Sequence, residues 1–338
     1  MKEILTRPSN IKATMIADSI NYQGVRICTM ELEYPRFIHA EAKTHRMIKF
    51  GGSEVYFEQD VSLMDERDLS RNASSSRAVP TLKAIDQVAD NMAVPLYWGA
   101  NQGGMQAGGE VANVDMCQGW WQTAFSGAAE CSKHLHENNL HKQHAARLIE
   151  SFQMMKTLVT LTEFDNFFNL RLHPDAQPEI MRLAYEMYQA MQNSEPMLLK
   201  AGEWHLPYIT IMRNPKNDDL LYFSGSERVT LEQAQRISAS CCAQTSYRKT
   251  DTSLEKADFV FDRLIQSDVL HSSPFEHLAT PSRDQSKNIN GLDEGITHTD
   301  RSGNHWSGNL REWISYRHLL PNNTCNKFDF EKRMELFK

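Results

Sequence analysis

Hydrophobic side chains recur at intervals of three and four residues in several stretches of the chain. This spacing predicts helices over residues 37–49, 81–92, 115–156, 179–193 and 306–320, with the third pattern divided near Asn138 and Asn139. In residues 24–37 apolar side chains instead occupy near-alternate positions, which favours one or two strands. Residues 202–209 read as a turn that leads into a further strand.

Capping signals predict two more helices. Thr230 with Gln233, and Thr252 with Glu255, each have the spacing of a capping box. Residues 214–219 and 282–304 are polar and read as loops. Strands and helices are interspersed without a visible repeat or linker, so we expect one intertwined α/β (α+β) unit over residues 1–338.

The stretch 160–180 combines an aromatic helix pattern with an arginine. Phe164, Phe167, Phe168 and Leu172 share helical spacing, and the helix should end at the His-Pro pair 173–174. Asp175 is the predicted N-cap of the next helix. Arg171 lies among these apolar positions, where its five fixed donors can meet an anion or a carbonyl of a ligand. The alternative is a buried arginine that pairs with Glu163 or Asp165.

Two loops are candidate ligand contacts. Residues 69–77 read Leu-Ser-Arg-Asn-Ala-Ser-Ser-Ser-Arg, and hydroxyls and amides between two arginines suit a phosphate, although an ordinary serine-rich loop has the same composition. Residues 95–106 are rich in glycine and aromatic side chains, which indicates a structured, ligand-lining loop. Their glycine spacing fits neither a Walker loop nor a dinucleotide fingerprint.

Histidines gather in the second part of the long helical pattern. His134, His136, His141 and His144 have no carboxylate at a recognised metal-site spacing, so they indicate a solvated helix surface and no metal site.

Composition narrows the class of protein. The 338 residues are 41% hydrophobic and 23% charged, as expected of a folded globular protein. The formal net charge of −7, without a long basic run, argues against binding to polymeric nucleic acid but allows a nucleotide monomer. The six cysteines form no Cys-x-x-Cys pair, which favours reduced thiols. Without an apolar leader or a run of about 20 apolar residues, we expect a cytoplasmic protein that does not bind membranes.

Three separated stretches together resemble one family, the flavin-dependent thymidylate synthases. Residues 44–46 and 70–77 are similar to the family pattern Arg-His-Arg-x-x-Ser-x-Asn-Glu-x-Ser-x-Arg-Tyr. Residues 160–180 resemble the family's helix with an asparagine, an Asn-Leu-Arg triplet and an Ala-Gln-x-Glu-Ile helix start. Residues 271–277, His-Ser-Ser-Pro-Phe-Glu-His, resemble the family's His-x-Ser/Thr-Pro-Phe-Glu-His, and residues 242–247 resemble its Ala-Arg-Val-Ser-Tyr segment.

The chain also departs from the family pattern. An insertion, residues 47–69, separates the two halves of the first pattern, and residues 282–338 form a C-terminal extension. Thr44, Ala73 and Ala78 replace the family's arginine, glutamate and tyrosine, and Glu41 stands where the family has a nucleotide-binding glutamine. The Ser-Pro-Phe-Glu-His segment follows the other two patterns here but comes first in the family, which indicates a divergent or circularly permuted branch.

The resemblance implies a fold and an activity. The implied fold has a central, mostly antiparallel sheet with helices. The implied enzyme is a methyltransferase that moves a one-carbon unit from methylenetetrahydrofolate to C5 of a deoxypyrimidine monophosphate, converting dUMP to dTMP. FAD would supply a hydride, NADPH would re-reduce the FAD, and no enzyme nucleophile would attack the pyrimidine. Family members are homotetramers whose sites draw on several subunits.

The resemblance also implies roles for individual residues. Arg171 would be the catalytic residue, stabilising negative charge that develops on the pyrimidine. The implied nucleotide-binding residues, besides Arg171, are Glu41, Ser75, Ser76, Arg77 and Arg147. The implied FAD-binding residues are Thr44, His45, Arg46, Thr160, Thr162, Asn166 and Ser273.

Two alternatives stay open. The departures at positions 41, 44, 73 and 78 fall around the expected nucleotide and flavin, so a sister enzyme could hydroxymethylate dUMP or act on dCMP. A non-catalytic flavin- or nucleotide-binding protein could also retain the scaffold, although the presence of Arg171 with Asn166 speaks against it.

Overall fold

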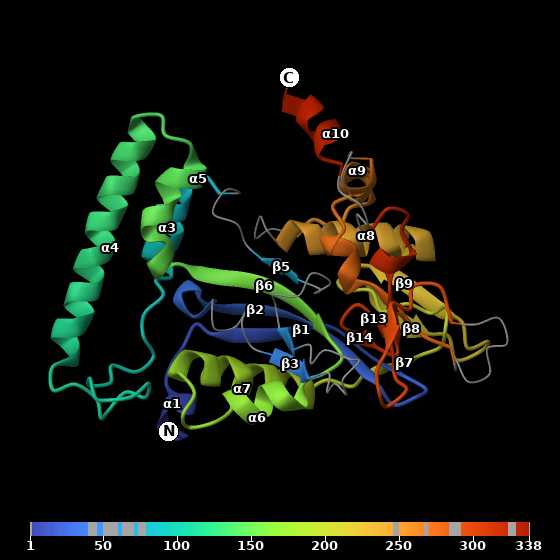
Figure 1. Cartoon of the computed structure of the whole chain (residues 1–338), viewed down its shortest axis with the longest axis horizontal. Helices are drawn as coiled ribbons and strands as arrows, with labels where there is room; N and C mark the ends of the chain where they lie inside the picture. Colours follow the sequence, from blue (N-terminus) through green and yellow to red (C-terminus); the bar gives the residue numbers. More distant parts are fainter. Residues whose placement is uncertain are drawn as a thin grey trace.

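A five-stranded sheet forms the centre of the protein in the computed structural model (Figure 1). The structure describes residues 2–39, 46–49, 60–62, 71–73, 79–245, 250–266, 270–283, 292–323 and 329–337. The strand order is β5-β6-β2-β1-β7, and every neighbouring pair is antiparallel except β1 with β7. The five strands are β1 (Lys12–Asn21), β2 (Arg26–Pro35), β5 (Arg71–Ala73), β6 (Met154–Leu161) and β7 (Met197–Leu199). The predicted mixed α and β architecture with a mostly antiparallel central sheet is confirmed.

A tight turn joins β1 to β2. The side chain of Asn21 accepts hydrogen bonds from the backbone N–H groups of Gln23 and Val25, and Gly24 has a φ of 79° that suits glycine. The strand predicted in residues 24–37 is confirmed as β2, whereas β1 was not predicted. Both faces of β2 and β6 are largely buried, so side chains of either face pack against helices or loops.

Two helices cover one face of the sheet and lie below it in Figure 1: α6 (Asp165–Arg171) and α7 (Pro178–Gln192). The apolar stripe of α7, including Ile180, Leu183 and Met187, packs against Met30 and Leu32 of β2. The helix predicted around Phe164 to Leu172 is confirmed as α6, which ends before the His-Pro pair 173–174. The predicted N-cap is wrong: α7 is preceded by Gln177, and the backbone N–H of Asp175 instead donates to the ring of His173 in the preceding turn.

The helices α8 (Leu231–Gln244) and α9 (Leu254–Ile265) pack together with the short helix η4 (Ser273–His277). Their core includes Phe261 and Phe275, together with Leu158 of β6. The capping box of Thr230 and Gln233 is confirmed at the start of α8. The second helix is also confirmed, but its N-cap is Ser253 rather than Thr252.

A separate group of helices lies to the left in Figure 1. It consists of α3 (Thr81–Asp90), α4 (Val114–Glu137), α5 (Lys142–Ala145) and η2 (Ala146–Phe152). The predicted break near Asn138 and Asn139 is confirmed, and Asn139 has a φ of 61°. The helix predicted to reach residue 156 ends earlier, because Met154–Leu161 pairs with β2 as β6.

Two other predicted helices are wrong, one in part and one in most of its length. The expected 37–49 helix is helical at its start, where η1 (Arg36–Ile38) and residue 39 lie, and residues 40–45 lie outside the described residues. Residues 46–49 instead form the strand β3 (Arg46–Lys49), which pairs with β4 (Asp60–Ser62). The expected helix 306–320 is mostly strands: β13 (His305–Ser307), β14 (Leu310–Arg311) and β15 (Trp313–Ser315), then η6 (Tyr316–Leu319).

Short elements complete the chain. They are α1 (Lys2–Thr6), β8 (Thr210–Arg213), β9 (Leu220–Ser224), β10 (Glu227–Val229), β11 (Ala279–Pro281), β12 (His298–Thr299), α10 (Phe330–Met334) and η7 (Glu335–Phe337). The polar loop predicted at 214–219 joins β8 to β9. Three small sheets lie beside the central one: the three-stranded sheets β10-β9-β8 and β12-β13-β14, and the two-stranded sheet β11-β15.

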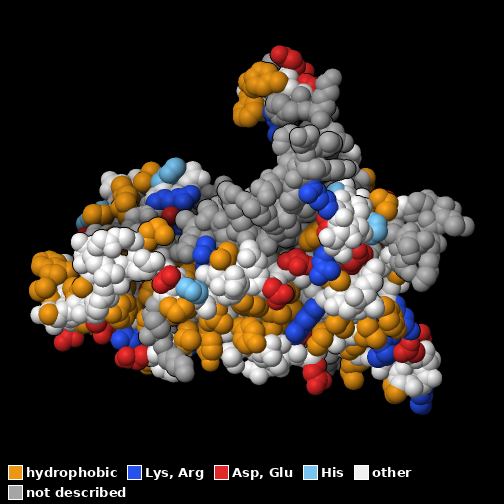
Figure 2. Space-filling model, turned by 60° about the horizontal axis from the view of Figure 1, so that its bottom comes forward, with side chains coloured by type: hydrophobic (Ala, Val, Ile, Leu, Met, Phe, Trp, Pro, Cys, Tyr) orange, Lys and Arg blue, Asp and Glu red, His pale blue; other side chains and the backbone are white. Residues whose placement is uncertain are grey.

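The molecular surface carries both signs of charge. Figure 2 shows one face, on which acidic and basic side chains are mixed among hydrophobic ones over the residues that the structure describes. Within those residues, no helix combines the length and the apolar character that crossing a lipid bilayer requires.

Candidate functional site

Strand β6 brings together stretches that are far apart in the sequence. β5, which leads into residues 74–77, pairs with β6 and packs against η4, the Ser-Pro-Phe-Glu-His helix. At the end of β6, Thr160 Oγ1 lies 2.8 Å from Nδ1 of His277 at the end of η4. Shortly after β6 the chain forms α6, which packs against β3. The structure therefore gathers parts of all three family-like stretches around one strand.

Thr160 belongs to a buried chain of hydroxyls and imidazoles. Thr160 Oγ1 is 2.6 Å from Thr29 Oγ1, which is 2.8 Å from Nε2 of His205. Nδ1 of His205 is in turn 2.9 Å from Ser19 Oγ. The five hydrogen-bonded side chains, which include His277, are each at most 3% exposed. Their hydrogen bonds therefore hold β1, β2, β6 and η4 together.

Burial keeps both histidines of this chain neutral. Loss of water contact lowers the pKa of His205 and the pKa of His277 to about 3 each. Neutral imidazoles suffice for every link, because each hydroxyl can donate and accept, and neutral His205 has one ring nitrogen that donates and one that accepts. The chain can therefore hold η4 in place but does not supply a charge.

Two aromatic anchors position α6. Phe164 and Phe167 are buried against the sheet, whereas Asn166 is exposed on the same helix. Arg171 is the last residue of α6 and is partly buried, with its Nε atom inside the protein. A helix C-terminus favours a cation because its last carbonyls point outward. The helix thus presents an amide and a guanidinium from one short element.

Ser273 begins η4 and is exposed, while Pro274, Phe275, Glu276 and His277 are buried. The buried residues fix the helix, and the Ser273 side chain lies at its exposed start.

The two threonines predicted to contact FAD are engaged within the chain. Thr160 is fully buried in the hydroxyl–imidazole chain. Thr162 is 6% exposed, and its hydroxyl accepts a 3.0 Å hydrogen bond from the backbone N–H of Arg311. Their contact with FAD stays a prediction, and each has a structural partner that the sequence did not reveal.

Several predicted residues lie outside the described part of the chain. Residues Glu41, Thr44, His45, Ser75, Ser76 and Arg77 belong to this group. Arg46 begins β3, whose backbone alone is described. Arg147 is described: it lies on η2 with its side chain 54% exposed, among α3, α4 and α5, and it pairs with Glu150 at 3.0 Å. Its phosphate contact stays a prediction.

The donor set suits a flavin nucleotide in its chemistry. Asn166 and Ser273 offer an exposed amide and hydroxyl, which can bond ring or phosphate oxygens, and Arg171 adds a cation. Across the described residues, no group of three or more His, Cys, Asp or Glu side chains is arranged to hold a metal ion.

The predicted ligand-lining loop 95–106 does border a hollow. Pro95, Leu96 and Trp98 line a cavity of about 450 Å³ beside Arg7 and Glu110. The Arg7 guanidinium bonds both carboxylate oxygens of Glu110, at 2.8 and 3.2 Å, and lies over the ring of Tyr97. Arg7 therefore links Tyr97 of the loop to Glu110, and the ligand contact of the loop stays a prediction.

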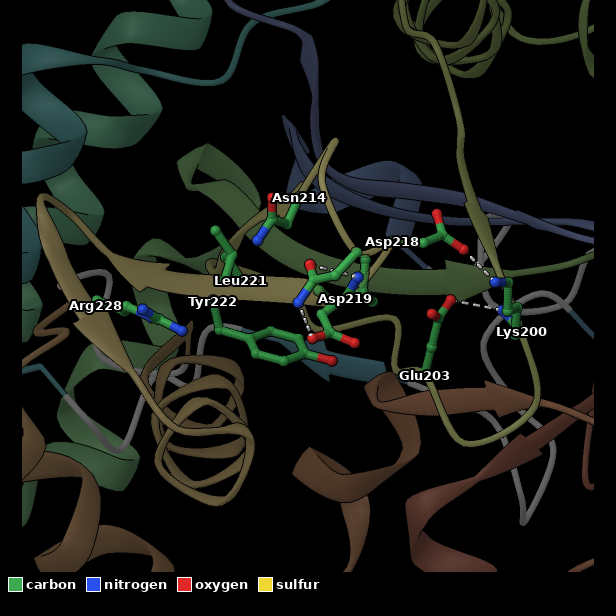
Figure 3. Close-up of a pocket in the computed structure, with 10 residues that line it drawn as sticks. Lys200, Glu203, Asn214, Asp218, Asp219, Leu221, Tyr222 and Arg228 are labelled. Atoms are coloured by element: carbon green, nitrogen blue, oxygen red, sulfur yellow. Dashed lines mark hydrogen bonds and ion pairs between the residues drawn. The ribbon is translucent and has the colours of Figure 1, made fainter.

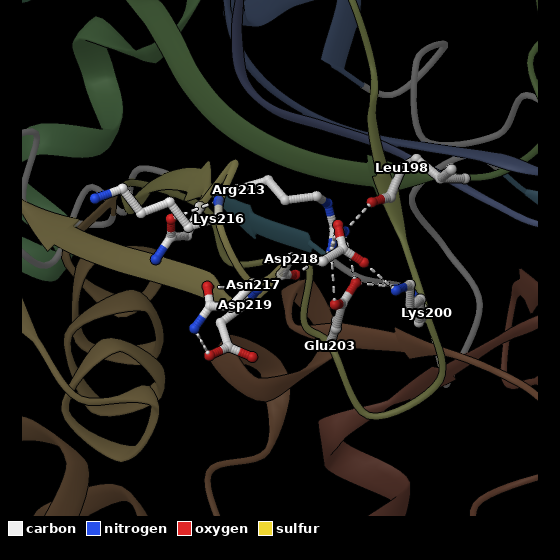
Figure 4. Close-up of polar contacts among 9 residues, drawn as sticks. Leu198, Lys200, Glu203, Arg213, Lys216, Asn217, Asp218 and Asp219 are labelled. Carbon is white, nitrogen blue, oxygen red and sulfur yellow. Dashed lines mark hydrogen bonds and ion pairs between the residues drawn. The ribbon is translucent and has the colours of Figure 1, made fainter.

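A second, polar hollow of about 530 Å³ lies beside the β8–β9 hairpin (Figure 3). Its lining includes Asn214, Asp219, Tyr222 and Arg228, and none of the described predicted site residues contributes to it. Burial raises the pKa of Tyr222 to about 12. Nearby, Arg213 pairs with Glu203 and Lys200 with Asp218 (Figure 4), so much of the charge around this hollow is internally paired.

No protein-family model matches the sequence, and a search of curated proteins finds no match. Two solved structures that it resembles are of a UMP/dUMP methylase PolB from Streptomyces cacaoi, one bound with 5-Br dUMP and one with 5-Br UMP. Sequence identities are 14% and 15%, with TM-scores of 0.39 and 0.41. Each alignment covers 56% of this chain, and 92% and 91% of the respective neighbour chain. The likeness is distant and involves little more than half of the present chain.

Proposed function

We propose that this protein is a flavin-dependent enzyme that transfers a one-carbon unit from methylenetetrahydrofolate to C5 of a deoxypyrimidine monophosphate, converting dUMP to dTMP. The observation that carries the proposal is the meeting of the family-like stretches around β6. β5 pairs with β6, Thr160 contacts His277, and α6 packs against β3. Sequence positions 46, 73, 160 and 277 thus belong to contiguous parts of one structure, as a shared active site requires.

The neighbourhood of β11 supports a permuted chain order. Ala279, just after η4, packs in one apolar cluster with Val25, which precedes β2, and Ile27 of β2. β2 leads toward residues 44–46. The end of the Ser-Pro-Phe-Glu-His segment is therefore a spatial neighbour of the strand that precedes the Thr-His-Arg segment, although the two are far apart in sequence.

Different residues of the chain would bind FAD, bind the nucleotide and position the elements that carry them. Asn166 and Ser273, with Thr44, His45 and Arg46, would bind and orient FAD. When bound and reduced by NADPH, FAD would supply the hydride. Because Thr160 and Thr162 already have partners, we expect them to position α6 and η4. Glu41, Ser75, Ser76 and Arg77 would hold the nucleotide and its phosphate, and Arg171 would stabilise negative charge developing on the pyrimidine.

Three buried cysteines are poor candidates for a thiolate nucleophile. Burial raises the pKa of Cys241 to about 12 and raises the pKa values of Cys28 and Cys242 well above the ordinary range. These three thiols therefore stay protonated near neutral pH. The proposed chemistry instead relies on Arg171 to make the pyrimidine carbon nucleophilic.

The test begins with the purified protein and FAD. We expect a bound-flavin absorbance spectrum, and then a methylated nucleotide when dUMP, methylenetetrahydrofolate and NADPH are added. Mass spectrometry of the product separates a methyl from a hydroxymethyl group, and parallel assays with dCMP test the base. Absence of a flavin spectrum even with added FAD would overturn the proposal. Flavin binding without any product would favour a non-catalytic binding protein.

A further inference from the structure

The C-terminal extension carries two arginines that reach the family-like stretches. Arg311, on β14, donates from its backbone N–H to Thr162 Oγ1 at 3.0 Å and from its Nε to Glu163 Oε1 at 2.5 Å. Arg317, on η6, donates from Nη1 to Oε1 of Glu276. Glu163 lies just before α6, and Glu276 lies within η4. One segment of the extension therefore contacts the carboxylates of two separate stretches.

Both ion pairs, Arg317 with Glu276 and Arg311 with Glu163, are at least partly buried. The side chains of Arg317 and Glu276 are 12% and 5% exposed, so both charges lie largely out of water and the ion pair compensates them. Arg311 and Glu163 are 29% and 32% exposed, which leaves them partly shielded from water. Ion pairs in such positions hold a defined geometry better than exposed surface pairs.

Backbone and ring contacts join the same segment to η4. β15 pairs with β11, which follows η4 directly, and the Tyr316 N–H donates to the carbonyl of Leu278 at 2.8 Å. The ring of Tyr316 stacks on Phe275, with centroids 5.7 Å apart and an interplanar angle of 22°. The segment 311–317 is thus attached to η4 at several points and reaches from there to the start of α6.

We propose that Arg311 and Arg317 are positioning residues for the reaction. By holding Glu163 and Glu276, they fix α6, which carries Asn166 and Arg171, relative to η4, which carries Ser273. This inference rests on the proposed function. Small displacements of groups that orient a reactant cost about 10²-fold in rate, so loss of either pair should affect turnover beyond its effect on stability.

The first test compares Arg311→Gln with a matched ion-pair variant, Arg213→Gln. Arg213 pairs with Glu203 at the β8 hairpin (Figure 4), and these side chains are 23% and 19% exposed, similar to the Arg311 pair. We expect Arg311→Gln to lower kcat about 10²-fold. Arg213→Gln should keep the wild-type kcat at an equal or larger loss in Tm. A purely structural role for Arg311 would change Tm alone.

Charge reversal provides a rescue. The double variant Arg311→Glu with Glu163→Arg should recover at least about tenfold in kcat over Arg311→Glu alone, because the pair is re-formed with opposite orientation. Where Arg317→Gln does not fold, the double variant Arg317→Gln with Glu276→Gln removes both buried charges, and we expect it to fold with a lowered kcat.

The outcomes separate the two proposals. If the wild-type protein gives no flavin-dependent turnover, the proposed function fails and this inference fails with it. If the wild type turns over and both Arg311→Gln and the Arg317→Gln with Glu276→Gln variant keep its kcat and KM, the inference alone is overturned.

Discussion

Arg171 is the side chain on which the proposed chemistry depends. Replacing Arg171 with Ala removes the cation that would stabilise charge on the pyrimidine, so we expect kcat to fall about 10²–10³-fold. Flavin should still bind, since Asn166 and Ser273 are unchanged. Single-turnover assays and the flavin spectrum check both parts. Arg228→Ala, at the exposed β10 hairpin, is the control and should leave turnover intact.

Two buried histidines should make stability depend on pH. The pKa of His205 and that of His277 are lowered to about 3 by burial, from an ordinary 6.5. Below pH 6.5 the unfolded state binds protons that the folded state does not, so the free energy of unfolding decreases as the pH falls toward 3. The slope is about 1.4 kcal/mol per pH unit for each histidine.

Urea denaturation at pH 6, 5 and 4 measures this slope. His277→Gln should remove the contribution of one histidine over this range. An identical slope in the wild type and His277→Gln would contradict the assignment of His277 as a buried neutral group.

At the scale of elements, the start of α9 offers a sharp comparison between neighbours. Ser253 accepts the backbone N–H of Lys256 as N-cap, whereas the adjacent Thr252, favoured by the sequence pattern, is exposed and does not cap the helix. Ser253→Ala should therefore lower the free energy of unfolding by about 1 kcal/mol. Thr252→Ala should change the free energy of unfolding little. Denaturant titration of both variants checks this, and a larger loss in Thr252→Ala than in Ser253→Ala would contradict the assignment of the N-cap.

Local signals predicted the elements whose shape depends on neighbouring residues. The capping box at Thr230, the apolar stripe of α7 and the strand β2 were all readable from spacing. The predicted helix 306–320 failed although Trp306, Leu310, Trp313 and Ile314 have helical spacing. The chain instead turns at Gly308 and Glu312, which have φ values of 61° and 55°. β13 and β14 form a local hairpin, and β15 pairs with the distant β11.

The candidate site shows the same division. The family-like sequence motifs identified Asn166, Arg171 and Ser273 as candidate site residues. The structure places them on α6 and η4. His205 and Arg311 were missed, because they act through Thr29, Thr160 and Glu163 at separations of more than a hundred residues. No periodicity or spacing in a single sequence reports such contacts.

At the scale of the whole molecule, strand β15 of the C-terminal extension is packed into the central structure. Trp313 is fully buried among Val25, Ile27 and Leu199, and its indole N–H donates to the carbonyl of Val25 at 3.1 Å. Gln23 and Ser282 both donate to the carboxylate of Glu312. These contacts link both ends of the sequence, so the extension and the sheet should unfold together.

Trp313→Ala tests this cooperativity. Loss of a fully buried indole should lower the free energy of unfolding by about 3–5 kcal/mol. If residues 1–338 form one intertwined domain, far-ultraviolet circular dichroism and tryptophan fluorescence will report a single coincident transition, at lower denaturant in the variant. Trp120→Ala, at a site that is 68% exposed, should leave the midpoint almost unchanged. A variant in which only a minor early transition shifts would instead indicate a separately folding C-terminal unit.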